Sequence, residues 1–213
     1  HWPGYPPPDA IAADLSAQMA FRLLDHPELI PAGTELVSNN HFDQDGLVSI
    51  YALVQPEEAR SRQAFLEDVA SAGDFATFRL RDAARISMAL AAASRGADPT
   101  LSALPADYAE QTGILYTELL RRLAEWCDHP ERLAHLWGEE DAALSASDDA
   151  LARGTATIEE RPDVDLAVVR VDAEAAAPER GGHRFGHVQT TGLHPMAVFA
   201  RTERLVVVTV RGR

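Results

Sequence analysis

The stretch from Thr34 to Val54 constrains the fold more than any other part of the chain. Residues 34–40, which contain the apolar pair Leu36-Val37, are interpreted as a strand, and the apolar run over residues 46–54 is typical of a short buried helix. Between them lies the polar turn His41-Phe42-Asp43-Gln44-Asp45-Gly46. A strand that is followed by a polar turn and a helix is the unit with which an open α/β sheet places ligands at its carboxyl edge. The sequence therefore predicts an α/β fold in which helices flank a sheet.

His41, Asp43 and Asp45 alternate with other residues in this turn. Side chains two positions apart point the same way in extended backbone, so a short piece of chain presents an imidazole and two carboxylates together. Nitrogen and oxygen ligands of this kind suit Mn²⁺, Mg²⁺ or Fe²⁺ better than a metal that prefers thiolates. We therefore expect these side chains to bind a metal ion and to be the catalytic residues.

Two alternatives compete with a catalytic metal site. The turn resembles a calcium loop in register, but a glutamate is needed at its twelfth position, where Ala52 stands. A strand, rather than a helix, is also expected before it, so we reject the calcium loop. The second alternative is an acidic turn in which a carboxylate caps the following helix, and it stays open.

Charge limits the partners that the chain can have. The formal net charge is −14, and all 19 basic residues are Arg. Nucleic-acid binders usually carry a basic face, so we expect no long nucleic acid as partner. A small phosphorylated molecule or a nucleotide is compatible with this charge, because metals and a few arginines reverse the sign locally. The absence of Lys excludes a Walker-type phosphate loop.

Composition also suggests the compartment of the cell in which the protein is found. No apolar run is long enough to cross a membrane, and no signal peptide is recognisable. The single Cys127 excludes disulfide frameworks and suits a reducing compartment. We therefore expect a cytoplasmic protein without a membrane partner, and the sequence predicts no oligomeric state.

The chain changes character near its middle, from helical periodicity to short strand-like runs. We expect a helix-rich α/β part with the metal site over residues 1–130, and a connecting helix with a β-rich part over residues 131–213. A first helix is expected to start near Asp9. Further helices are expected over residues 56–73, 80–94, 108–126 and 130–153. The strands are expected at Thr155–Ile158, Val164–Val171, His183–Gln189, Met196–Ala200 and Leu205–Val210.

The His-x-Asp-x-Asp-Gly pattern of residues 41–46, with a helix of small residues after it, resembles the first motif of the DHH phosphoesterase superfamily. In that superfamily the His and Asp residues bind a pair of Mn²⁺ ions that activate water against a phosphoester or phosphoanhydride. The resemblance implies a metal-dependent phosphoesterase with one or two Mn²⁺ or Mg²⁺ ions. It also implies a DHH-like open sheet, followed by a smaller β-rich part that binds substrate. The whole chain is also similar to an uncharacterised bacterial family with the same Asn-Asn-His-Phe-Asp-x-Asp-Gly stretch and a downstream Gly-Asp-Phe.

The chain departs from the DHH pattern in two places. The Asp-His-His triplet is missing, since Asp128-His129 is followed by Pro130 at a helix junction. The further metal-bridging Asp has its best counterpart in Asp74, which we expect just beyond a helix that ends at Gly73. The alternative for Asp74 is an ordinary carboxylate at the end of a helix.

Basic side chains elsewhere are candidates for substrate binding. Arg81 and Arg85 lie four residues apart on one expected helix, where they would hold a phosphate; the alternative is a solvated face paired with neighbours such as Asp82. The expected β-rich part supplies the remaining candidates, which are His183, Arg184 and His187 in one expected strand and His194, which precedes Pro195. Their alternative is the ordinary fate of a surface residue.

Two other functional classes also remain open from the sequence. One is a metal-dependent hydrolase of a substrate without phosphorus, because the ligand set does not specify the element that is attacked. The other is a non-catalytic metal- or ligand-binding protein whose DHH-type site is degenerate.

Overall fold

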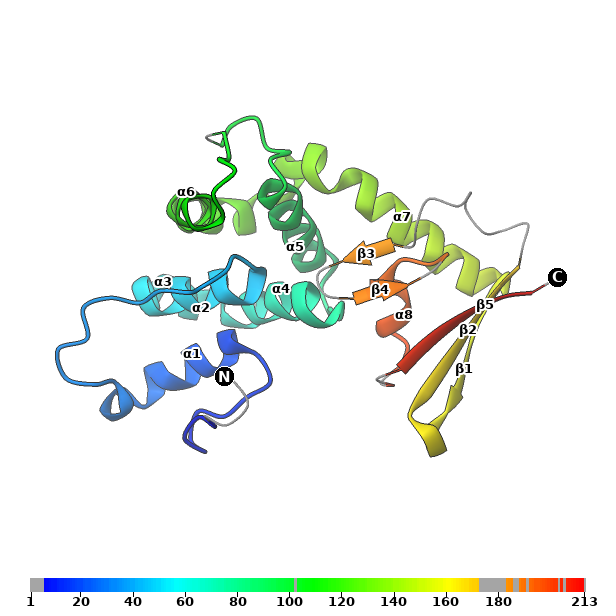
Figure 1. The fold of residues 1–213 in the computed structure, drawn as a ribbon, viewed down its shortest axis with the longest axis horizontal. Helices are drawn as coiled ribbons and strands as arrows, with labels where there is room; N and C mark the ends of the chain where they lie inside the picture. The colour runs from blue at the N-terminus through cyan, green and yellow to red at the C-terminus, as the bar shows by residue number, and fades with distance from the viewer. Residues whose placement is uncertain are drawn as a thin grey trace.

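The computed structural model describes residues 6–101, 103–172, 183–185, 188–190, 192–202, 204 and 206–212. Within these residues the fold is a mixed α/β arrangement that is mostly helical. Figure 1 shows the helical region, α1 to α7, beside a smaller region that carries all the described strands. The helices are α1 (Ser16–Asp25), α2 (Gln44–Val54), α3 (Pro56–Ser61), α4 (Gln63–Phe75), α5 (Arg81–Ser94), α6 (Tyr108–Asp128), α7 (Ala134–Arg153) and α8 (Pro195–Phe199).

The prediction of a strand over residues 34–40 is wrong. This segment is irregular, and its apolar side chains face solvent: Leu36 is 89% exposed and Val37 is 39% exposed. Without a neighbouring strand the backbone of this segment has no ladder to join. Since the first described strand begins at Ala156, the DHH-like open sheet around the His41 turn is not confirmed.

Helix α2 lies at the centre of the helical region. Of its residues from Gln44 to Ala52, only Ser49 is not buried. A helix that is apolar on all sides must be enclosed, and α2 packs against α1, α4 and α6. The buried helix predicted after the turn is therefore confirmed, although helices and not a sheet surround it.

Most other helices agree with the prediction to within a few residues. Helices α5 and α6 occupy the expected ranges, and a short 3-10 helix at Pro130–Leu133 precedes α7. The first helix begins at Ser16 rather than near Asp9. The helix expected over residues 56–73 is divided into α3 and α4, and α4 continues past Gly73 to Phe75. It ends where Ala76 adopts a left-handed conformation with φ of 54°.

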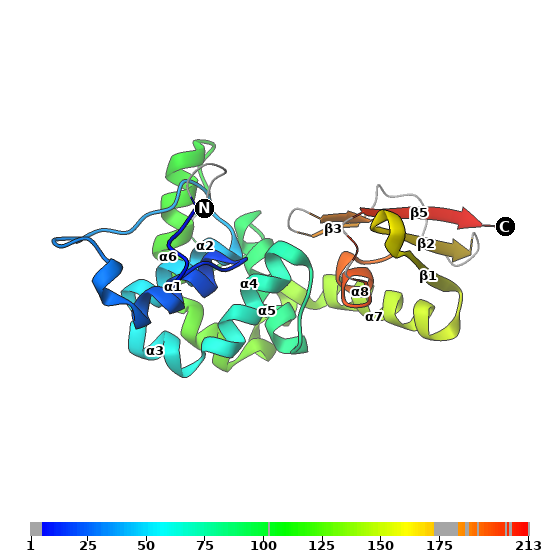
Figure 2. The ribbon, with the colours of Figure 1, turned by 90° about the horizontal axis from the view of Figure 1, so that it is seen from below.

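The strands form two small sheets. The first has the order β1-β2-β5, with β1 (Ala156–Arg161) antiparallel to β2 (Leu166–Asp172) and β5 (Val206–Gly212) parallel to β2. Its inner side chains, among them Val169 and Val171, pack against residues of α7 and α8. Figure 2 shows α7 and α8 on one side of these strands.

Two of the predicted strands differ from the structure. The range His183–Gln189 is a hairpin of β3 (His183–Phe185) and β4 (Val188–Thr190). The range Met196–Ala200 belongs to α8, because a five-residue apolar run has no periodicity that separates a strand from a buried helical turn.

Candidate functional site

The turn before α2 holds a histidine and a carboxylate in direct contact. Asp43 is the N-cap of α2, and its Oδ1 accepts the N–H of Gly46 at 2.6 Å. Its other oxygen, Oδ2, lies 2.6 Å from Nε2 of His41. The side chain of His41 is 42% exposed and that of Asp43 is 18% exposed. Asp43 therefore caps the helix with one oxygen and pairs with an accessible imidazole through the other.

Tyr116, on α6, fixes this turn from a distant part of the chain. Its hydroxyl donates to the carbonyl oxygen of His41 at 3.0 Å and accepts from Nδ2 of Asn39 at 3.1 Å. The ring of Phe42 meets the Tyr116 ring edge-on, with centroids 5.4 Å apart. A Cβ at Gly46 would lie 2.5 Å from the Tyr116 hydroxyl oxygen, so only glycine fits there. Burial raises the pKa of Tyr116, which keeps its hydroxyl able to donate.

Asp45 has a structural task that its spacing does not reveal. Its two oxygens accept the backbone N–H groups of Ser16 at 2.8 Å and Ala17 at 2.7 Å. These amides open α1, whose own N-cap, Leu15, supplies no capping side chain. Burial raises the pKa of Asp45, and the amide hydrogen bonds counteract part of this rise. Both carboxylates of the turn therefore cap helices: Asp43 caps α2, which is the capping alternative that the sequence left open, and Asp45 caps α1.

Asp74 lies in the last turn of α4, next to this arrangement. Gly73 allows the approach, because a Cβ at that position would lie 2.7 Å from Cβ of Gln44 at the start of α2. In the described part of the chain the Asp74 carboxylate has no hydrogen bond or ion pair. Burial, followed by the negative charges of Asp45 and Asp43, raises the pKa of Asp74 to about 7, and His41 offsets part of this rise. The prediction that Asp74 belongs with the His41 turn therefore agrees with its electrostatic neighbours.

These side chains do not form a ready-made metal centre. Among the described residues no group of three or more His, Cys, Asp or Glu side chains is placed to hold a metal ion. The arrangement offers an accessible His–Asp pair, and beside it a half-buried carboxyl group that changes its protonation near neutral pH. Such a perturbed group in a polar cluster is a typical mark of a functional site.

Arg81 and Arg85 face α7 rather than the His41 turn. Arg81 donates from Nε to Asp141 at 2.6 Å and from Nη1 to Asp148 at 3.2 Å. Arg85 contacts Asp141 and Asp82, and its guanidinium carbon lies 4.6 Å from the ring centroid of Trp137. Both arginines therefore join α5 to α7. This is close to the alternative given by the sequence, in which they pair with neighbouring carboxylates such as Asp82.

The candidates from the β-rich part are dispersed. His194 is fully buried, caps α8 through Nδ1, and has Nε2 2.8 Å from Oε1 of Glu140 on α7. His183 and Arg184 lie in strand β3, whereas His187 is outside the described residues. Figures 1 and 2 place the β3–β4 hairpin on the side of this region that faces α4 and α5.

Comparison with known families decides where the chain belongs. A family of unknown function, DUF6687, matches it over residues 1–212. The chain is a member of DUF6687. No curated protein and no solved structure matches it. The DUF6687 match covers the helical and the β-rich regions together, and the comparisons do not show a relation to DHH phosphoesterases. In this DUF6687 member, none of the described helices has both the length and the apolar content to span a bilayer.

Proposed function

We propose that this DUF6687 member is a hydrolase that depends on a divalent cation, Mn²⁺ or Mg²⁺, and cleaves a small phosphorylated molecule. Its reaction centre would consist of His41, Asp43 and Asp74. The observation that supports it most is the meeting of α2 and α4, where Asp74 has no ion pair within the described residues although two further carboxylates lie nearby. Binding of a cation or a proton to a site with this negative charge is favourable and stabilises the folded chain.

The helix ends contribute to the same balance. Asp74 occupies the last turn of α4, where the helix dipole is negative and disfavours a carboxylate. Asp43 sits at the start of α2, where the dipole is positive and favours one. The charge that lacks compensation is therefore concentrated on Asp74, and we assign it the first contact with a cation.

His41, Asp43 and Asp74 would hold the ion, which supplies a bound water of lowered pKa and polarises the phosphoryl oxygen. Asp45 would stay on the amides of α1 and keep the turn in place. Asp74 would give up its proton when the ion binds, because a cation lowers the pKa of about 7 that this carboxyl group has without it. His41 would bind the ion once its Nε2 is released from Asp43.

A second candidate is a non-catalytic protein that binds a metal or a small ligand. It is favoured by the commitment of Asp45 to Ser16 and Ala17, and by the lack of a preformed group of three ligands among the described residues. A hydrolase of phosphorus-free substrates has no observation of its own in its favour.

Metal titration by calorimetry and turnover assays test these proposals together. The substrates are p-nitrophenyl phosphate, cyclic dinucleotides and short oligonucleotides, each with Mn²⁺, Mg²⁺ or EDTA. The variants are Asp43→Asn and Asp74→Asn; asparagine caps helices about as well as aspartate, so Asp43→Asn removes charge and keeps the cap. Asp149→Asn on α7, whose side chain is 70% exposed, is the matched control.

Mn²⁺-dependent turnover that both site variants lose and the control keeps supports the hydrolase. Metal binding that both site variants weaken, without turnover on any substrate, supports the binding protein. Absence of metal binding by the wild-type chain contradicts the hydrolase and the metal-binding protein.

A further inference from the structure

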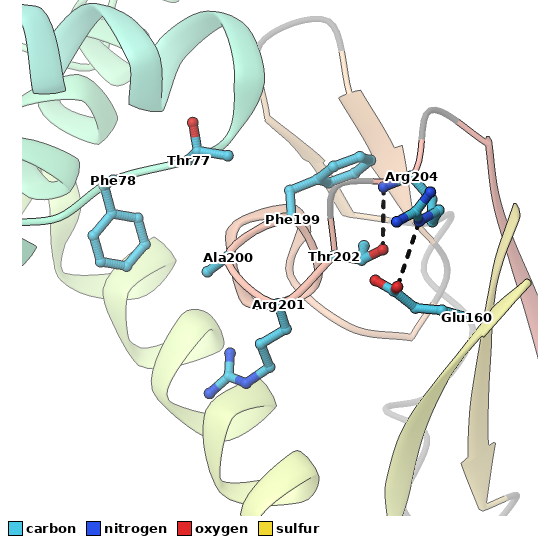
Figure 3. Close-up of a pocket in the computed structure, with 8 residues that line it drawn as sticks. All are labelled: Thr77, Phe78, Glu160, Phe199, Ala200, Arg201, Thr202 and Arg204. Atoms are coloured by element: carbon cyan, nitrogen blue, oxygen red, sulfur yellow. Dashed lines mark hydrogen bonds and ion pairs between the residues drawn. The ribbon is translucent and has the colours of Figure 1, made fainter. Parts of the chain in front are cut away.

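A cavity of about 510 Å³ lies at the junction of the helical region and the strands. Its walls come from the segment after α4, from α8 with the residues that follow it, and from β1 (Figure 3). Pockets for small molecules usually enclose about 300–1,000 Å³. None of the proposed reaction-centre residues lines this cavity, so it is a separate feature of the molecule.

Two arginines in its wall have hydrogen-bonding capacity to spare. Arg204 is 25% exposed, and its contacts with Glu160 at 3.4 Å and Asp165 at 3.6 Å are long. Its buried Nε is the atom that lies 3.4 Å from Oε2 of Glu160, and this ion pair does not have the geometry of a hydrogen bond. Within the described part of the chain, Arg201 contacts Asp148 and the carbonyl oxygen of Ala197 through Nη1 only, each at 2.8 Å. A buried donor without an acceptor costs free energy, so an acceptor group from a ligand is favoured here.

Aromatic rings form the apolar part of the wall. Phe78 and Phe199 both line the cavity, and Figure 3 shows the Phe199 ring close to Arg204 and the Phe78 ring farther away, on the segment after α4. Both rings are only partly buried by the neighbouring core, so each keeps surface for a ligand. The hydroxyl of Thr202 and the carboxylate of Glu160 add polar groups that recognise N–H or O–H donors.

We propose that this cavity binds a small aromatic anion, which is a flat ring system that carries a phosphate, sulfonate or carboxylate group. The anionic group accepts hydrogen bonds from Arg204 and from the nitrogens of Arg201 that make no contact within the described residues. The ring lies against Phe78 and Phe199, where it gains apolar contact. Glu160 accepts from a ring amine or a sugar hydroxyl. The proposal goes beyond the hydrolase and does not rest on it.

The test is calorimetry on the whole chain in EDTA, with adenosine monophosphate, 1-naphthoate, adenosine and inorganic phosphate as probes. We expect the two aromatic anions to bind at least about tenfold more tightly than the neutral nucleoside or the bare anion, because each of those lacks one of the two recognition elements. Arg204→Gln is expected to weaken the binding of both aromatic anions about tenfold or more and to leave the affinity for adenosine unchanged. Arg153→Gln, with a side chain 67% exposed on α7, is the matched control.

Two measurements keep this result separate from the hydrolase. Adenosine monophosphate is titrated into Asp74→Asn, where unchanged affinity supports the cavity and lost affinity overturns it. Amide NMR shifts of the wild-type chain locate the probe without any variant. Shifts at Thr77, Phe78 and Ala200 support the cavity, and shifts confined to the turn of residues 41–43 overturn it. Failure of every probe to bind, or binding that Arg204→Gln leaves unchanged, also overturns the proposal.

Discussion

The interface of α5 with α7 and the meeting of α2 with α4 both bury carboxylates, but they treat them in opposite ways. At the first, Asp141 receives the guanidinium groups of Arg81 and Arg85. Burial alone would raise the pKa of Asp141, and the two arginines outweigh it and lower the pKa. At the second, no described arginine approaches Asp74, and its pKa rises to about 7.

The comparison shows that burial alone does not make an acidic residue functional. Arginine neutralises Asp141, which therefore serves as a tie between helices. Asp74 is left with a charge that a proton or a cation relieves, and stability is lost where it stays ionised. In a chain with a formal net charge of −14, an uncompensated carboxylate lowers the stability of the fold unless a cation or another ligand binds to it. The following variants test this.

Asp141→Asn is expected to have the largest effect, because it leaves two half-buried arginines without their shared carboxylate. We expect the free energy of unfolding to fall by about 3 kcal/mol at pH 7, as measured by urea denaturation. The contribution of a lowered pKa is present above the unfolded value and disappears as pH falls through the folded one. The loss should therefore shrink in acid, and a loss equal to that of Asp149→Asn would contradict the role of the interface.

Asp45→Ala is expected to cost about 2 kcal/mol, because two buried amides of α1 lose their acceptor. Asp45→Asn keeps one acceptor oxygen and should cost about half as much. Thermal unfolding followed by circular dichroism measures both. If Asp45→Ala is as stable as the wild type but abolishes metal binding, Asp45 is a ligand and not a cap.

Asp74→Asn should have the opposite sign and stabilise the chain by about 1–2 kcal/mol at pH 8. Because the folded pKa is raised, the folded state binds more protons than the unfolded state between about pH 4 and 7. The wild type therefore loses stability as pH rises through this window, and the variant does not. Melting temperatures from pH 4 to 8 give the profile, and Mn²⁺ should remove the wild-type slope. Parallel stability profiles of the wild type and the variant without metal would show that the pKa of Asp74 is not raised in the folded state.

Tyr116→Phe is expected to have the smallest effect, about 1 kcal/mol, through loss of the hydroxyl that joins Asn39 to the His41 carbonyl. The ring contact with Phe42 is kept, so the core should be undisturbed. Calorimetric melting and Mn²⁺ affinity are compared with Tyr108→Phe, where the side chain is 58% exposed. Unchanged affinity would show that the turn holds its shape without the hydroxyl.

The sequence predicts the components of the candidate site better than their setting. The alternation at His41 and Asp43 identified a pair that does meet, and Asp74 is drawn into the same electrostatic environment. The strand expected before them failed because an apolar run indicates a strand only when a partner strand exists. Periodicity contains no information on partners.

Contacts between distant elements were beyond the reach of local patterns. Asp45 caps α1, and Asp68 of α4 accepts the amides of Arg79 at 2.9 Å and Leu80 at 2.7 Å before α5. Neither carboxylate is adjacent in sequence to the helix that it caps, so no capping pattern reveals it. Tyr116 was missed for the same reason, since its partners lie more than 70 residues earlier in the chain.

The bond from Asp45 to the amides of Ser16 and Ala17 has a practical consequence. Whatever shifts the turn at Asp43 must pull on the first turn of α1, because Asp45 is covalently continuous with one and hydrogen-bonded to the other. Deuterium uptake at those two amides then acts as a remote gauge of occupancy. It should slow when a ligand steadies the turn, even if the reaction that follows has not been found.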